Sequence, residues 1–320
     1  MKMVKIIGII ILMIIVVFVS LLAASTINHK IQLRKESQKY SPKGIIVEFD
    51  GINSHVFTAG TGDLTLVFLS GHGTTYPTLD FKPIWVKLVD DYRIAVVEKP
   101  GYGWSEPSKS PRDIASLLEE TRKALEMAGE APPYVLIPHS MSGLEAIFWA
   151  QNYPDEVHAI IGLDPCTPEI YDVLPEPEKF QLYTMFFISR IGITRLMPDS
   201  EIENNFPLLK TDNLTEKEKQ EYLAVFYKNA FSIDMLREID YLQENARTIA
   251  EREVPVHTPL YFFISSGQDA VVDGWSEILA GYISKVANGK QMQLTASHYI
   301  HYEKAEIVAE EITAFLDEIK

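Results

Sequence analysis

The sequence predicts an α/β protein with a mainly parallel central sheet flanked by helices, a helical lid insertion and an N-terminal transmembrane helix. Three observations predict this class. Short apolar runs alternate with longer amphipathic segments over residues 45–165 and 256–320, which is typical of a parallel sheet covered on both faces. The alternation stops over residues 166–255, where helical patterns take over. An uncharged run, Ile6–Asn28, precedes the rest of the chain.

The composition is that of a folded globular protein. Of the 320 residues, 47% are hydrophobic and 23% are charged, so the chain has enough apolar surface to offset its conformational entropy. The 29 Lys and Arg residues against 44 Asp and Glu give a net charge of −15. Because an acidic chain repels phosphate backbones, we expect no nucleic-acid partner. A single cysteine, Cys166, excludes an intrachain disulfide and a multi-cysteine metal site.

Residues 1–28 form a membrane anchor or signal segment. The run Ile6–Ala24 is nearly all large and apolar, and a span requires roughly 20 such residues. It is longer than the hydrophobic region of about 7–15 residues in a cleaved signal peptide, which favours a retained single-pass anchor. Small residues around Ala23–Ser25 leave cleavage and secretion open, and a buried core helix is the third alternative.

Positive charge flanks this run on both sides, with Lys2 and Lys5 before it and five basic or histidine residues between 29 and 39 after it. The charges therefore set the orientation poorly. We expect the bulk of the chain outside the cytoplasm, because an N-terminal hydrophobic segment commonly serves as an export signal. Residues 29–44 are predicted to be a polar linker.

The elements of the core follow in order. Strands are predicted at Ile45–Phe49, His55–Thr58, Leu64–Leu69, Tyr92–Val97, Tyr134–Ile137, Val157–Leu163, Leu260–Ile264 and Gln291–Leu294. Helices are predicted at Phe81–Val89, from Ser110-Pro111 to about Ala128, from the turn after Tyr134–Ile137 to Asn152, and at Glu303–Ile319. Pro111 suits the first turn of its helix because the missing N–H is not needed there.

The insertion over residues 166–255 is predicted to be a set of helices over one end of the sheet. Thr215 and Glu218 make a capping box for a helix over Leu214–Ala230. Several large apolar residues of the insertion could line a hydrophobic pocket or pack the insertion onto the core. They are Tyr183–Ile188, Met197, Phe206, Phe226, Tyr227 and Phe231.

The sharpest chemical signal is the segment Pro138–Gly143, which reads PHSMSG and lies between an apolar strand and a helix. In a G-x-S-x-G nucleophile elbow, the serine occupies a tight strained turn that lifts its hydroxyl above the sheet. The following helix begins at this turn, and its free N–H groups suit a developing oxyanion. Here Pro138 and Ser142 stand at the two glycine positions. The segment alone is equally consistent with an ordinary helix cap.

A second glycine-rich turn, Ser70–Gly73, follows the strand Leu64–Leu69. Such a turn allows a backbone N–H to point into a site at the same edge of the sheet. The amides of His72 and Met141 could then hold an oxyanion together. A plain structural turn is the alternative, and use of the His72 imidazole as a base is a weaker one.

An acid and a histidine follow the last two strands. Asp269 lies in the loop after Leu260–Ile264, and His298 lies in the loop after Gln291–Leu294. A serine hydroxyl needs a base to take its proton, and a carboxylate on the far nitrogen orients that base. The chain order Ser140, Asp269, His298 is the order of such triads on this type of sheet.

These segments together resemble the α/β-hydrolase superfamily, in its lidded branch of esterases, lipases and proline-iminopeptidase-like enzymes. The resemblance rests on LVFLSGHG, VVEKPGYGWSE, PHSMSGLEAIFWAQNYPDEV, SGQDAVV and SHYIHYEKAE, in order over about residues 45–320. The chain departs from the family pattern at the elbow and at Ala296-Ser297, where the family commonly has a glycine pair. Relatives that open epoxides or displace halide have an aspartate in the elbow, so Ser140 argues against both reactions.

The resemblance implies that Ser140 is the nucleophile, His298 the base and Asp269 the orienting acid, with His72 and Met141 forming the oxyanion hole. His301 is the rival histidine, and Asp164 is the rival acid because some relatives have it after that strand. His139 is expected to pack in the elbow, and Glu145 to be a solvated or hydrogen-bonded carboxylate. Cys166 is expected to be a small buried residue.

The expected reaction is hydrolysis of a carboxylic ester through an acyl-enzyme, with no metal or organic cofactor and with a small-molecule substrate. An amide or aminopeptidase substrate of the proline-iminopeptidase type and a non-catalytic binding protein of the same fold remain open alternatives. The sequence does not determine the oligomeric state.

Overall fold

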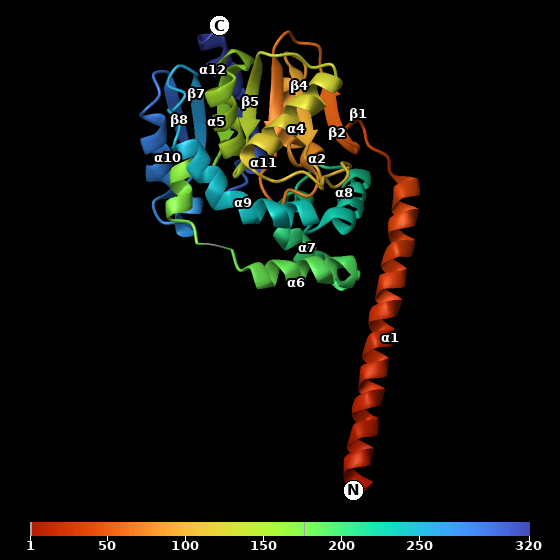
Figure 1. Cartoon of the computed structure of the whole chain (residues 1–320). Helices are drawn as coiled ribbons and strands as arrows, with labels where there is room; N and C mark the ends of the chain where they lie inside the picture. The colour runs from red at the N-terminus through yellow and green to blue at the C-terminus, as the bar shows by residue number, and fades with distance from the viewer. Residues whose placement is uncertain (1, 176) are drawn as a thin grey trace.

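The computed structural model describes residues 2–175 and 177–320, and it consists of an α/β body with a long N-terminal helix. That helix, α1 (Lys2–Lys39), runs along one edge of the body and extends far beyond it (Figure 1). The chain enters the body through β1 (Ile45–Phe49). The C-terminus lies at the opposite end of the body from α6 (Lys179–Arg190), a helix of the insertion over residues 166–255, which we call the cap.

The sheet confirms the predicted fold class. Its strand order is β1-β2-β4-β3-β5-β6-β7-β8, with β1, β2 and β4 paired antiparallel and all other pairs parallel. The strands are β1 (Ile45–Phe49), β2 (Ile52–Ala59), β3 (Thr65–Leu69), β4 (Arg93–Glu98), β5 (Tyr134–Pro138), β6 (Val157–Leu163), β7 (Leu260–Ser265) and β8 (Gly289–Leu294). The central strands are buried on both faces, which explains why they read as continuous apolar runs.

Helices cover both faces of the sheet and build two hydrophobic cores. In β3, Val67 and Leu69 belong to one core and Leu66 and Phe68 to the other, as the two-residue period of a strand requires. The first core is closed by α4 (Ile114–Met127), α5 (Ser142–Asn152) and α10 (Trp275–Ile283), and the second by α3 (Lys82–Leu88) and α12 (Ala305–Glu318). The short helices α2 (Pro77–Asp80) and α11 (Ile300–Glu303) lie at the strand ends.

Helix α4 begins later than predicted. Asp113 is its N-cap, and the carboxylate accepts the backbone N–H of Ser116 at 3.0 Å. Pro111 therefore lies before the helix and not in its first turn, because the capping side chain sets the boundary.

The helical insertion lies between β6 and β7, at the edge of the sheet where the parallel strands end (Figure 1). It contains α6, α7 (Asp199–Asn205), α8 (Glu216–Asn229) and α9 (Ile233–Ala250). The predicted capping box of Thr215 and Glu218 is present at the start of α8. Phe206 and Phe226 pack ring against ring at 5.0 Å, so these two residues join cap helices and do not line a pocket.

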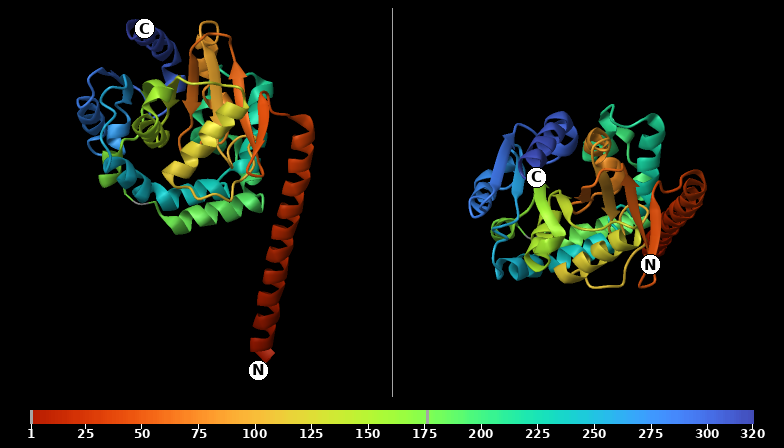
Figure 2. Two further views of the ribbon diagram at one scale, coloured as in Figure 1. Left: turned by 45° about the horizontal axis from the view of Figure 1, so that its top comes forward. Right: turned by 90° about the horizontal axis from the view of Figure 1, so that it is seen from above.

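Helix α1 continues through most of the predicted linker. Residues 29–39 are helical and pack on the cap, so the prediction of a linker over 29–44 is wrong for that part. His29 is buried, and its Nδ1 accepts a hydrogen bond from Arg195 at 2.9 Å. Figure 2 shows the rest of α1 projecting from one edge of the body. This apolar part is long enough to cross a membrane, a property shared by anchors and signal peptides.

A buried ion pair fixes the start of the turn after β4. The Glu98 carboxylate lies 2.8 Å from His55 Nδ1 and accepts hydrogen bonds from the Thr78 hydroxyl at 2.7 Å and the Trp104 N–H at 2.7 Å. Burial opposes the charge on both partners, but their mutual attraction outweighs it. The pKa of His55 is raised above 6.5, and the pKa of Glu98 is lowered below 4.5.

Replacing Glu98 by glutamine should lower the free energy of unfolding by about 3 kcal/mol, because it leaves a buried imidazole without its counter-charge. The raised pKa of His55 means that its stabilisation is present at low pH and is lost as pH rises through the folded-state pKa. The difference between wild type and Glu98→Gln, measured by urea unfolding in detergent, should therefore be larger at about pH 6 than at about pH 9. Glu119→Gln at the exposed pair with Lys123 is the control and should not change the midpoint. An equal difference at both pH values would contradict a stabilising pair between Glu98 and a protonated His55.

Candidate active site

Ser140 lies at a strained turn between β5 and α5. Its φ is 55°, in the left-handed region that a residue with a side chain rarely adopts. The backbone packs tightly around it: a side chain at Gly71 would approach the Ser140 Cβ to 2.8 Å, and one at Gly143 would approach the Cys166 carbonyl to 2.3 Å. These two glycines therefore permit the elbow, although neither Pro138 nor Ser142 is glycine.

Ser142 explains the departure at the second glycine position. Its hydroxyl donates to the Leu69 carbonyl at 2.6 Å and accepts the His139 N–H at 3.0 Å. It thereby ties the elbow to the end of β3, from which the glycine-rich turn at Gly71–Gly73 begins. A glycine could not make either bond.

The two predicted oxyanion donors adjoin the elbow. Within residues 2–175 and 177–320, the backbone N–H groups of His72 and Met141 donate to no protein acceptor. The His72 side chain is occupied elsewhere, because its Nε2 donates to the Met235 carbonyl of α9 at 2.9 Å. Its backbone N–H therefore stays available, as an anion-binding amide would require.

His298 is oriented by Asp164. Its Nδ1 lies 2.6 Å from Oδ2 of Asp164, which is fully buried at the end of β6. The same carboxylate accepts the backbone N–H of Ser265 at 2.8 Å, the Ser265 hydroxyl at 2.6 Å and the Trp275 indole N–H at 2.8 Å. A buried carboxylate with four donors is held in one orientation, which also fixes the imidazole.

The structure does not bring Asp269 to His298. The Asp269 carboxylate instead accepts the Ser276 N–H at 2.9 Å and the Ser276 hydroxyl, as a cap at the start of α10. The expected contact is wrong because chain order does not distinguish the loop after β7 from the end of β6. A signal for Asp164 was present in the sequence, since it directly follows an apolar strand, as Ser140 does.

The remaining histidines surround this pair. His139 is buried, its Nε2 donates to the His298 carbonyl at 3.1 Å, and the two rings are 4.7 Å apart. Burial, followed by the nearby His301 and His298, lowers the pKa of His139 well below its usual value. The rival histidine, His301, lies 3.1 Å from Asp80 and is fully buried. His139 is thus a packed elbow residue, and His301 belongs to a second buried pair.

The Ser140 side chain turns toward the Cys166 thiol in this structure, and the described residues include no hydrogen bond from it to His298. Burial raises the pKa of the Cys166 thiol to about 12, so this cysteine is a neutral neighbour. Rotation of a serine side chain between staggered positions is a small movement. Catalytic hydrogen bonds are often long or absent before substrate binds.

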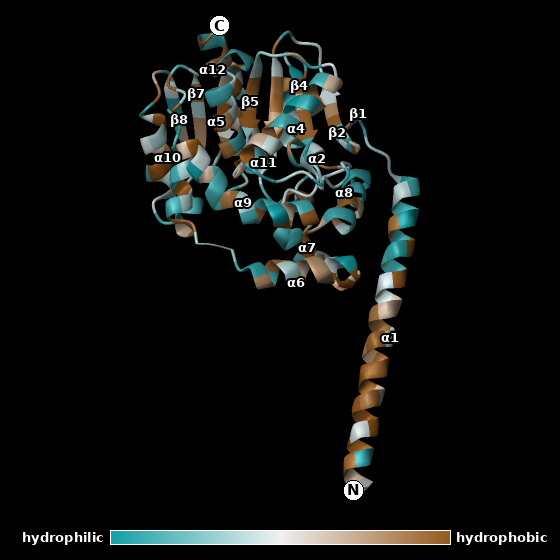
Figure 3. Ribbon diagram, viewed as in Figure 1, coloured by the Kyte–Doolittle hydropathy of each residue, from teal (hydrophilic) through white to brown (hydrophobic). Residues whose placement is uncertain are grey.

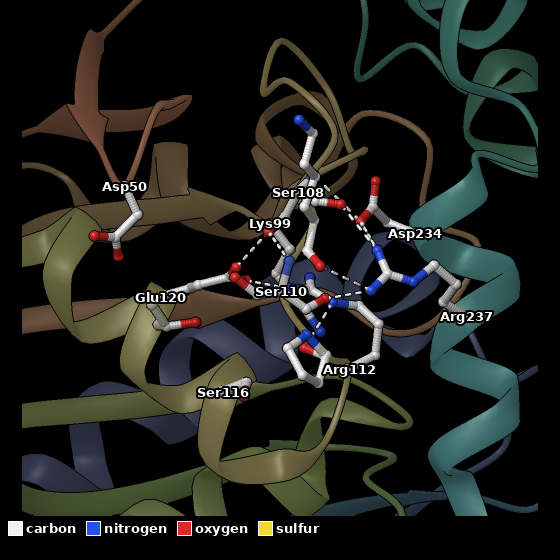
Figure 4. A network of polar contacts seen from close by, with 12 residues as sticks. Asp50, Lys99, Ser108, Ser110, Arg112, Ser116, Glu120, Asp234 and Arg237 are labelled. Carbon is white, nitrogen blue, oxygen red and sulfur yellow. Dashed lines mark hydrogen bonds and ion pairs between the residues drawn. The ribbon is translucent and has the colours of Figure 1, made fainter.

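A buried polar network joins the cap helix α9 to the core. Figure 4 shows Arg112, Glu120, Asp234 and Arg237 around the loop that precedes α4. Arg112 pairs with Glu120 at 2.5 Å, and Arg237 donates to the Ser108 carbonyl at 2.9 Å. Burial raises the pKa of Asp234 to about 6. The network holds α9 firmly over the site.

Little space is left directly under α9. A cavity of about 10 Å³, room for about one water molecule, lies between the elbow residues Met141 and Ser142 and the buried carboxylates of Glu145 and Glu238. Glu145 is neither solvated nor free: Thr121 donates to it at 2.5 Å, and Lys99 lies at 3.5 Å. Among the described residues, no group of three or more His, Cys, Asp or Glu side chains is arranged to hold a metal ion.

Comparison with known proteins identifies the family. Residues 65–273 match the family model described as the alpha/beta hydrolase fold. The chain belongs to the α/β-hydrolase fold family. A Bacillus subtilis protein of uncharacterised function, YbdG, is 37% identical over 267 residues, which cover 81% of this chain and 80% of that protein.

Solved α/β-hydrolases share the architecture at low sequence identity. The enol-lactonase from Burkholderia xenovorans LB400 has a TM-score of 0.63 at 16% identity and covers 85% of this chain and 100% of its own. The epoxide hydrolase from Bacillus megaterium has a TM-score of 0.63 at 20% identity over 85% of this chain and 100% of its own. Because this fold serves different reactions, the residues of the site must decide the chemistry.

Asp164→Asn and Asp269→Asn form a matched pair of variants with the same change in shape and charge. If Asp164 orients His298, its replacement should slow reaction of Ser140 with a fluorophosphonate by roughly three orders of magnitude, because the imidazole loses its partner. Asp269→Asn should react at the wild-type rate. Slow labelling of Asp269→Asn together with normal labelling of Asp164→Asn would restore Asp269 as the acid.

Proposed function

We propose that the protein is a serine hydrolase that cleaves carboxylic esters of small or moderately hydrophobic substrates. The observation that carries this proposal is the left-handed Ser140 after β5, together with His298, whose ring lies 4.7 Å from the ring of the adjoining His139 and whose Nδ1 pairs with a buried carboxylate at the end of β6. Strain of this kind persists where the surroundings impose it, and it is common at active sites.

In the proposed mechanism, His298 takes the proton of Ser140 as the hydroxyl attacks the ester carbonyl. The new carbon–oxygen bond pushes the carbonyl electrons onto oxygen, where the His72 and Met141 amides stabilise the negative charge. One such donor contributes about 3 kcal/mol. His298 then gives its proton to the departing alcohol as the acyl-enzyme forms. A water molecule, deprotonated by His298, releases the acid and restores Ser140.

Asp164 stabilises the imidazolium that forms twice in this cycle. Its three other hydrogen bonds, from Ser265 and Trp275, hold its carboxylate in place beside His298. Because the base must be neutral, turnover should fall as the pH is lowered. The serine in the elbow supports ester chemistry over epoxide opening or halide displacement, which need an aspartate nucleophile.

A fluorophosphonate probe tests the nucleophile. Wild type should be labelled, whereas Ser140→Ala and His298→Ala should not, because one lacks the attacking oxygen and the other lacks the base. Ser284→Ala is the control, since it removes an exposed hydroxyl that donates to the Gly281 carbonyl and takes no part in the elbow. Turnover of p-nitrophenyl esters of increasing chain length should exceed turnover of aminoacyl anilides. Equal labelling of Ser140→Ala would refute the nucleophile, and the reverse preference would favour the amide alternative.

We further propose that α1 is a retained single-pass anchor and that the catalytic body lies outside the cytoplasm. Residues 29–39 pack on the cap, and Arg195 makes two hydrogen bonds of 2.7 Å to Glu36. Cleavage near Ala24 would separate residues 25–39 from the apolar run but would leave the contact between Arg195 and Glu36 intact.

The anchor predicts that the chain remains in the membrane pellet after carbonate extraction and keeps its full mass. Replacing Ile10 and Ile14 by arginine should release it, since charge at the centre of a span costs about 3 kcal/mol per residue. Replacing Lys30 and Lys35 by glutamine is the control and should not. A mature N-terminus at residue 25 or close to it would instead establish a secreted protein.

A further inference from the structure

The outward face of α6 is an apolar stripe without a protein partner in the described chain. Phe180, Tyr183 and Phe187 recur at helical spacing and have exposed fractions of 85%, 47% and 57%. Thr184 completes the stripe, and its hydroxyl is satisfied within the helix by the Phe180 carbonyl at 2.7 Å. Leu196, in the short helix that follows α6, is 76% exposed. Large apolar side chains exposed together in one patch indicate a surface that contacts a membrane or another protein.

This stripe lies beside the point where the apolar part of α1 ends. The Ser25 hydroxyl donates to the Ile191 carbonyl at 2.8 Å, and Gly192 packs so closely on His29 that an added side chain would approach its Cβ to 2.5 Å. Ser25 directly follows the apolar run Ile6–Ala24. Figure 3 shows α6 just above the brown, hydrophobic part of α1, on the side of the body from which α1 projects.

We infer that the α6 stripe rests in the surface of the lipid bilayer that α1 spans. The inference rests on the proposed anchor. Nineteen residues rise about 28 Å, close to the thickness of the hydrocarbon core. If Ile6–Ala24 fill that core, Ser25 and the segment bonded to it lie at the boundary between acyl chains and headgroups. The α6 stripe then faces the bilayer, where amphipathic helices bury their apolar side by about 5–10 Å.

The neighbouring chemistry suits lipid better than a second copy of the chain. Tyrosine is enriched at the membrane boundary, and phenylalanine is common on the apolar face of helices that lie there. Four basic residues, Lys30, Arg34, Lys35 and Lys39, follow the span on α1 and can attract anionic lipid headgroups. Arg190 holds the C-terminal end of α6 by donating to the Lys228 and Ala230 carbonyls at 3.0 and 2.8 Å. Arg190 thus ties α6 to the end of α8, and the Ser25 bond ties the segment after α6 to α1.

This placement deepens the proposed function by naming the source of the substrate. The cap of the hydrolase, and not its opposite end, is in contact with lipid, so esters dissolved in the bilayer are the substrates that reach it at the highest local concentration. The C-terminal helix α12 lies at the far end of the body from α6 (Figure 1).

The test places one environment-sensitive fluorophore at a time on the full-length chain in nanodiscs that each hold a single copy. Phe187→Cys and Thr184→Cys report the stripe, Ile14→Cys is the deep reference, and Glu310→Cys on α12 is the aqueous control. Cys166 is buried, so the wild-type chain serves as the labelling blank. Emission at 187 and 184 should be blue-shifted relative to 310 and quenched by lipids brominated near the headgroup, while the label at 14 is quenched from the bilayer centre.

Labels at 187 and 184 that match the label at 310 would overturn the inference. So would a blue shift that appears only when several copies share one disc, because the stripe would then bind a second copy of the chain. If the label at 14 is not quenched by lipids brominated near the bilayer centre, both the proposed anchor and this inference are refuted. Hydrolysis of a short water-soluble ester by the wild type and the same variants keeps the proposed function separate. No turnover by the wild type would refute the ester hydrolase but leave the lipid contact readable.

Discussion

The left-handed backbone at Ser140 is the constraint on which the rest of the site depends. A residue with a side chain adopts this conformation at a cost of about 1–2 kcal/mol, and the surroundings must offset it. The Ser140 carbonyl accepts the N–H groups of Gly143 and Cys166 at 2.9 and 2.8 Å, and Gly71 leaves space for its Cβ. The elbow therefore exists only where β3, β5 and β6 end side by side.

Asp164 has the same left-handed backbone conformation at the end of the neighbouring strand, β6. Its φ is 50°, so two residues with side chains stand in the left-handed region at the ends of β5 and β6. Each turn redirects a functional side chain out of the sheet. The isolated bridge between His139 and Leu163 joins the two strand ends just before these turns. Ser140 and Asp164, the proposed nucleophile and acid, thus follow two neighbouring strands, and His298 reaches Asp164 from the loop after β8.

The cap combines a fixed layer with an exposed one. Helix α9 is held by buried charges and by His72, whereas α6 attaches to the rest of the chain at its two ends, through Lys179 to Asp240 and through Arg190 and the segment after it. The fixed layer lies over the elbow, and the exposed layer lies next to α1. Because Arg195 connects the cap to Glu36 of α1, the position of α1 relative to the body is set by direct contacts and not by a linker.

Local sequence was sufficient for the elements that depend on neighbouring residues. The apolar runs identify the strands to within a few residues, the capping box at Thr215 marks α8, and the PHSMSG segment identifies the elbow, because periodicity, capping and turn chemistry act over a few positions. The long apolar helix is equally evident from composition. Only the tertiary structure decided between Asp164 and Asp269, showed that residues 29–39 are helical, and left the aromatic stripe of α6 exposed. Each of these depends on contacts between segments more than a hundred residues apart or on the way whole helices pack, and a linear pattern does not record which of two candidate carboxylates the folded sheet turns toward the histidine.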